Sequence, residues 1–123
     1  MSLFLVMAGG AIGSGARYLS GRAAFAIAGP DYPYSTLFVN LFGGLLMGVL
    51  AGLLARGVLA ESWRSFAGVG VLGGFTTFSA FSLDAVQLAE RGAPAMAAGY
   101  VLLSVLGSLA ALAMGIQLAR GLT

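Results

Sequence analysis

Three hydroxyl side chains and one amide are the polar groups whose spacing suggests chemistry. Tyr100, Ser104 and Ser108 stand four residues apart, so on a helix they lie on one face as a line of hydrogen-bond donors. Asn40 precedes Gly44 by the same interval, at a position where the amide could either join two helices or present its N–H pair to an anion. The residues alone leave both roles of Asn40 open.

The segment Gly73–Ser82, with the sequence GGFTTFSAFS, is a poor helix inside a long apolar stretch, because two glycines are followed by two β-branched threonines. A helix break there would free backbone carbonyl oxygens, which suit a hard cation such as sodium. Phe78 and Phe81 are three residues apart and could turn ring edges of positive character toward an anion. The alternative is that both rings pack in the core or against lipid.

Several kinds of chemistry are excluded by what the sequence lacks. It has no cysteine and no histidine, which excludes disulfides, thiol chemistry and imidazole catalysis. It also lacks a phosphate-binding loop, a dinucleotide fingerprint and a nucleophile paired with a base, so we do not expect an enzyme. Six scattered arginines form no basic patch, and we expect no nucleic-acid partner.

The elements that must position these groups are transmembrane helices. The chain is 59% hydrophobic and 8% charged, far from the roughly quarter charged residues of a soluble domain. About 20 apolar residues cross a bilayer as a helix. We therefore predict an all-α membrane protein in which residues 1–123 form a single four-helix transmembrane domain. The expected spans are approximately residues 2–28, 33–55, 65–89 and 94–120, the third broken in mid-span.

The first span carries no basic residues ahead of its apolar stretch, so we expect it to be retained and not cleaved as a signal peptide. With four spans, Arg56, Arg64 and Arg120 lie on one side of the membrane, against Arg22, Arg91 and the more deeply placed Arg17. This near balance fixes no orientation by the positive-inside rule. Either lipid or partners orient the chain, or copies insert in both directions and pair antiparallel.

Glycines form the second pattern, 20 of them in 123 residues. Gly44, Gly48 and Gly52 recur every four residues, and Gly9 and Gly13 show the same interval. Faces of small residues let helix backbones approach closely in a membrane. Tight packing alone explains most of them. Because four short helices enclose little volume, an ion pathway is expected between copies of the chain and not within one.

The motifs, taken together, resemble the CrcB/Fluc family of fluoride channels along the whole chain. Gly9-Gly10-Ala11-Ile12-Gly13 with Ala16-Arg17-Tyr18 is similar to the family's opening GGxxG…ARY. Thr36-Leu37-Phe38-Val39-Asn40 is similar to its TLxVN motif, and the segment Gly73–Ser82 to its GGxTTFSTFS signature. The third of these motifs is the most specific.

The resemblance implies a fluoride-selective channel in the prokaryotic cell membrane. Such a channel lets cytoplasmic fluoride leave passively, from an antiparallel, dual-topology homodimer with two pores. By motif, the implied pore residues are Asn40, Phe78, Phe81, Thr36, Tyr100, Ser104 and Ser108, and Arg17 would attract anions at an aqueous vestibule. The backbone carbonyls of Gly73 and Thr76, from both subunits, would hold a structural sodium ion that is not transported. Fluoride, a second copy of the chain and the lipid bilayer are the implied partners.

Three residues depart from the family pattern. Ser35 stands where a glycine is usual, Ala80 replaces a hydroxyl residue, and Asp84 stands where the family often has Glu. Two other functions compete with a channel. A small proton-coupled exporter would need a carboxylate near the midplane, and Asp84, toward the end of the third span, is the nearest acid. A packing subunit of a larger complex would account for the glycine faces.

Overall fold

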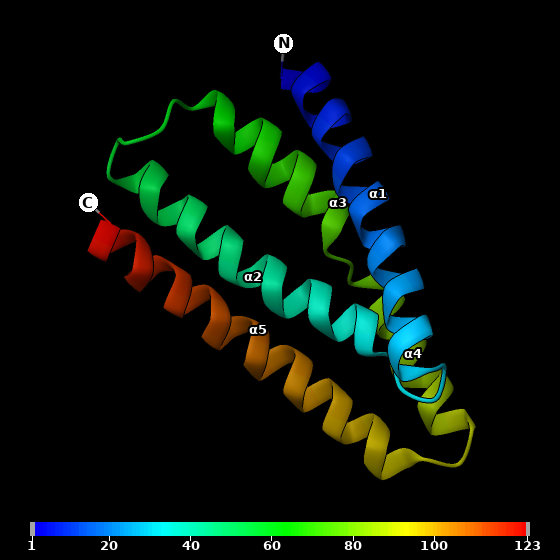
Figure 1. Ribbon diagram of the computed structural model, residues 1–123. Coiled ribbons are helices and arrows are strands. Elements are labelled where there is room, and N and C mark those ends of the chain that lie inside the picture. The colour runs from blue at the N-terminus through cyan, green and yellow to red at the C-terminus, as the bar shows by residue number, and fades with distance from the viewer. Residues whose placement is uncertain (1, 123) are drawn as a thin grey trace.

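The structure is a computed structural model that describes residues 2–122, and in that range every regular element is a helix, with no strand (Figure 1). Its elements, in chain order, are α1 (Ser2–Ala28), α2 (Tyr34–Ala55), the π-helical η1 (Arg64–Leu72), α3 (Gly73–Phe75), α4 (Ser79–Glu90) and α5 (Pro94–Leu122). The predicted all-α class is confirmed. The ends of the expected single domain, Met1 and Thr123, lie outside the described residues.

Three helical stretches within residues 2–122 are long and apolar enough to cross a membrane: Tyr34–Ala55, Arg64–Glu90 and Pro94–Leu122. Helix α1 has 27 residues, which is long enough to span ~30 Å of hydrocarbon. It carries Arg17 and Arg22, and its crossing stays a prediction. Most large apolar side chains on the outer faces of these helices are exposed, as expected where lipid or a second subunit covers them.

The helices end at glycines that reverse the chain. Gly57 and Gly92 follow α2 and α4 with φ angles of 73° and 84°, a conformation that glycine adopts without steric cost. After α2, the N–H groups of Gly57 and Val58 donate to Leu54 and Leu53, which is the paired bonding of a Schellman motif. These ends satisfy carbonyls that α2 would otherwise leave open at the membrane edge.

The helices pack as two parallel pairs, α2 with α5 and α1 with η1 and α3 (Figure 1). Along α2, Gly44 lies against Ser108, Gly48 against Leu112 and Gly52 against Ala119. A methyl group on Gly48 would meet the Leu112 carbonyl and the Gly115 backbone. The packing role predicted for this glycine face is therefore confirmed.

The third span is interrupted where the sequence predicted a break, but later than its glycines suggested. Gly73 and Gly74 remain helical, and the chain leaves the helix at Thr76, with φ −87° and ψ 162°. The Thr76 hydroxyl donates to the Leu72 carbonyl at 2.8 Å, a local bond by which threonine competes with regular helix. The break thus lies inside the predicted segment Gly73–Ser82, and the threonines, not the glycines, end the helix.

The helix before the break has an unusual winding that the sequence did not indicate. Over Arg64–Leu72 it is π-helical, and the Gly73 N–H donates to the Gly68 carbonyl, five residues back. Gly68 and Gly70 are buried, and Gly70 lies against the backbone of α1 at Leu5 and Val6. π-Helical turns are rare and often occur near functional sites. This one leads directly into the break.

Candidate functional site

A groove of about 390 Å³ lies between α2, the helix break, α4 and α5. None of the described residues that line it carries a charge. Its lining includes six of the residues predicted from the sequence: Asn40, Thr76, Phe78, Phe81, Ser104 and Ser108. Residues that are 68 positions apart in the chain, from Asn40 to Ser108, thus meet on one surface because α2 and α5 run parallel.

The two phenylalanines of the groove differ in their surroundings. Their ring centroids are 5.5 Å apart with the planes at 51°. Phe81 is 8% exposed and packs against Tyr100, whereas Phe78 is 76% exposed at the start of α4. Phe81 is therefore held by its own chain, and Phe78 has an open face that a second molecule or an ion could meet.

The predicted line of hydroxyls is present, but its members are used differently. Tyr100 is fully buried, and its hydroxyl donates to Asp84 Oδ2 at 3.2 Å. The Ser104 hydroxyl is buried and has no hydrogen-bond partner within residues 2–122. A buried polar group without a partner is costly. Ser104 is therefore a donor available to something that enters the groove.

Asn40 is engaged with the broken span. Its Oδ1 accepts from the Thr77 N–H at 2.8 Å, and its Nδ2 donates to the Thr77 carbonyl at 3.0 Å. In an uninterrupted helix the Thr77 N–H would donate to the Gly73 carbonyl. The amide thus joins two helices, one of the two roles left open by the sequence. It retains one N–H, which leaves the anion role untested.

Replacing Asn40 with Ala is expected to destabilise the protein by about 1–3 kcal/mol, because both polar groups of Thr77 lose their partner. The measurement is the thermal unfolding of the purified protein in detergent. Ser20→Ala is the matched control, since among the described residues the Ser20 hydroxyl donates to the Ala16 carbonyl of its own helix. Equal melting temperatures for the two variants would show that the Thr77 pairing contributes little.

Arg17 and Thr36 lie apart from the phenylalanine groove. Both line a second groove of about 590 Å³ between α1, the start of α2 and the break, together with Arg22. The Arg17 Nε donates to the Gly74 carbonyl at 3.0 Å. Among the described residues, Thr77 is the one that lines both grooves. The two grooves therefore adjoin at the helix break.

The two carbonyls expected to hold sodium lie where the helix opens. The Thr77 N–H is taken by Asn40, so the Gly73 carbonyl loses its regular helical partner, and Thr76 is extended. Two carbonyls from one chain are too few to replace the hydration shell of a cation. Two copies together with water would fit. No cluster of three or more acidic side chains that could hold a metal occurs in residues 2–122.

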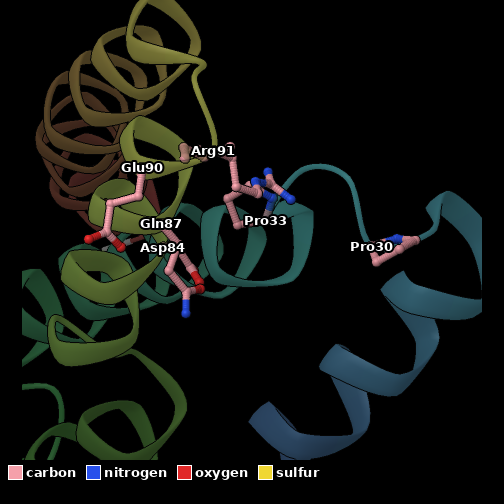
Figure 2. A pocket seen from close by; sticks show the side chains of 7 residues that line it. Pro30, Pro33, Asp84, Gln87, Glu90 and Arg91 are labelled. Atoms are coloured by element: carbon pink, nitrogen blue, oxygen red, sulfur yellow. The ribbon is translucent and has the colours of Figure 1, made fainter.

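A third groove, of about 470 Å³, opens at the far end of α4 (Figure 2). Asp84, Gln87 and Glu90 extend along α4, and the connection through Pro30 and Pro33 lies across from them. Arg91 donates to the Asp31 carbonyl at 2.9 Å and ties this connection to the end of α4.

The Asp84–Tyr100 hydrogen bond links this third groove to the hydroxyl line. Sequence reasoning missed the bond, because no spacing rule relates residues on two different helices. The Tyr32 and Tyr100 rings form a T-shaped pair, with centroids 5.6 Å apart. Burial, and to a lesser extent the neighbouring Tyr34, raises the pKa of the Tyr32 phenol.

Comparison with known proteins decides the family. The family profile described as "CrcB-like protein, Camphor Resistance (CrcB)" matches residues 4–116. The chain belongs to this CrcB family. A relative from Sphingopyxis alaskensis is 54% identical over 122 residues, with 98% of this chain and 97% of the relative covered. A relative from Mesorhizobium japonicum is 47% identical, with 98% of this chain and 98% of the relative covered. A relative from a Caulobacter species is 53% identical, with 96% of this chain and 94% of the relative covered.

All three relatives of this CrcB chain are named "Fluoride-specific ion channel FluC". They are channels and not enzymes, in agreement with the absence of catalytic motifs. With three helices apolar enough to cross a bilayer, the CrcB chain is a multi-pass protein of a bacterial membrane. The resemblance found in its motifs is thereby confirmed.

Proposed function

We propose that this chain is a fluoride-selective channel that lets cytoplasmic fluoride leave the cell passively and so reduces its toxicity. The observation that carries the proposal is the uncharged groove lined by Phe78 and Phe81, where the Ser104 hydroxyl has no partner within residues 2–122. The names of the relatives support the choice of ion.

The chemistry of the groove fits a strongly hydrated anion. A selective pore must replace the hydration shell of the ion, yet bind it weakly enough for release. Hydroxyls, the remaining Asn40 N–H and phenylalanine ring edges are weak donors that act together. A fixed cationic side chain in the same place would favour retention of the anion.

The proposed assembly is an antiparallel, dual-topology homodimer with two pores. Two observations support it: the open face of Phe78, and the insufficient number of carbonyls that one chain offers at Gly73 and Thr76. In the dimer these carbonyls from both subunits hold a structural sodium ion. Ser104 and Ser108 extend the path from the phenylalanines, with Tyr100 buried behind Phe81, and Thr36 and Arg17 line the adjoining groove through which anions would approach.

The test is ion efflux from liposomes that contain the purified protein. Fluoride is expected to leave at least about 100-fold faster than chloride, a difference of ~2.7 kcal/mol. Replacing sodium with N-methylglucamine is expected to reduce the flux. Equal rates for the two anions would refute selectivity, and no flux would refute the channel. Flux unaffected by sodium removal would argue against the sodium site.

A further inference from the structure

Arg17 points at the backbone of the broken span. Its Nε donates to the Gly74 carbonyl at 3.0 Å across 57 residues of sequence. Gly74 is the middle residue of α3, the last helical turn before the break. The guanidinium therefore contacts the main chain just where the third span stops being helical.

The Gly74 carbonyl lacks its regular partner. In a continuous helix it would accept from the Phe78 N–H, four residues on, but the chain becomes extended at Thr76. The carbonyls that end a helix carry partial negative charge. A side-chain N–H donor from α1 supplies the partner that such a carbonyl lacks.

Close packing holds Arg17 in reach of this carbonyl. A methyl group on Gly74 would lie 2.7 Å from the Gly10 carbonyl and 3.1 Å from the Ser14 N–H nitrogen. The backbone of α1 thus lies directly against α3. Asn40 makes the corresponding contact from α2, on the Thr77 side of the break.

We propose that Arg17 is a positioning residue that holds the helix break, through Gly74, in the shape that presents Thr77 and Phe78 to the ion path. This inference rests on the proposed function. It differs from attraction of anions at a vestibule, since it assigns the effect to one hydrogen bond and not to the charge. Neither Arg17 nor Gly74 lines the phenylalanine groove, so the effect passes through the backbone.

Three substitutions separate the hydrogen bond from the charge. In Arg17→Gln, the amide nitrogen lies as many bonds from the backbone as the arginine Nε, so the donor is kept and the charge is lost. In Arg17→Lys, the charge is kept, but the donor lies one bond farther and has no planar geometry. Arg17→Met has a similar length to Gln but neither donor nor charge.

The experiment measures fluoride and chloride efflux from liposomes for each variant, with the melting temperature in detergent. We expect Arg17→Gln to stay within about twofold of the unaltered protein in fluoride flux and in fluoride-over-chloride ratio. Arg17→Met is expected to lose about tenfold in flux and to lose part of the ratio. A role in folding alone would lower the melting temperature without moving the ratio. If Arg17→Met does not fold, the comparison of the other two variants decides, and we expect a higher fluoride flux from Arg17→Gln than from Arg17→Lys.

The result that would overturn the inference is the reverse order, with Arg17→Lys near the unaltered protein and Arg17→Gln as impaired as Arg17→Met. Normal flux and ratio in all three variants would overturn it equally. Absence of fluoride flux from the unaltered protein would instead refute the proposed function, and the inference with it.

Discussion

Replacing Phe78 with Ile is expected to lower fluoride flux by about tenfold, which corresponds to ~1.4 kcal/mol in the barrier. Isoleucine keeps the apolar bulk but has no ring edge of positive character to face the anion. Phe78 is 76% exposed in the single chain, so the substitution removes little packing within the chain. Its effect should therefore appear in conduction, as measured by fluoride efflux from liposomes.

Phe81→Ile is expected to reduce flux similarly, but also to lower the melting temperature. Phe81 packs with Leu88, Ala97 and Tyr100 in a buried cluster, where a change of shape typically costs up to ~1.5 kcal/mol. Phe4→Ile is the matched control, because Phe4 is an exposed residue of α1 outside the groove. Unchanged fluoride flux in both variants would show that the pore assignment is wrong.

Replacing Gly48 with Ala is expected to destabilise the fold by about 1–3 kcal/mol, as overpacking does in well-packed interiors. The added methyl would meet the Leu112 carbonyl, and Gly115 faces it at the same point. Backbone atoms cannot move aside as a flexible side chain can, so α2 and α5 would have to separate. The melting temperature and the yield of monodisperse protein in detergent measure the effect.

Gly99→Ala is the control for this experiment. No atom lies within 4 Å of the methyl that it would add, and alanine favours helix over glycine by up to ~1 kcal/mol. The control is thus expected to leave stability unchanged or to raise it. If Gly48→Ala were as stable as Gly99→Ala, close packing of α2 on α5 would not hold the fold together.

Much of the candidate site could be predicted from the sequence because its signals are local. Tyr100, Ser104 and Ser108 share a face by helical periodicity alone, and Ser104 and Ser108 indeed line the groove. Thr36 was predicted for the same path, but it lies in the groove of Arg17. Helical periodicity predicts which residues share a face, but not which neighbouring helix that face contacts. The sequence therefore could not predict which groove Thr36 lines.

The sequence by itself determined the class of the protein. Its few charges and long apolar runs leave helices in a bilayer as the structure that satisfies the backbone, and its glycine intervals require close helix packing. Its threonines at 76 and 77 weaken the third span near the right place. Each of these properties depends on residues that are close together in the sequence, so it can be predicted without the tertiary structure.

Only the tertiary structure decided how the break is held and what surrounds it. The π-helical winding of η1, the pairing of Asn40 with Thr77 and the bond from Arg17 to Gly74 depend on how three helices are rotated against one another. That rotation is set by backbone contacts at glycines far apart in the sequence. A shift of a few tenths of an ångström between helices decides whether a hydrogen bond forms. Local sequence patterns cannot predict helix positions with that precision.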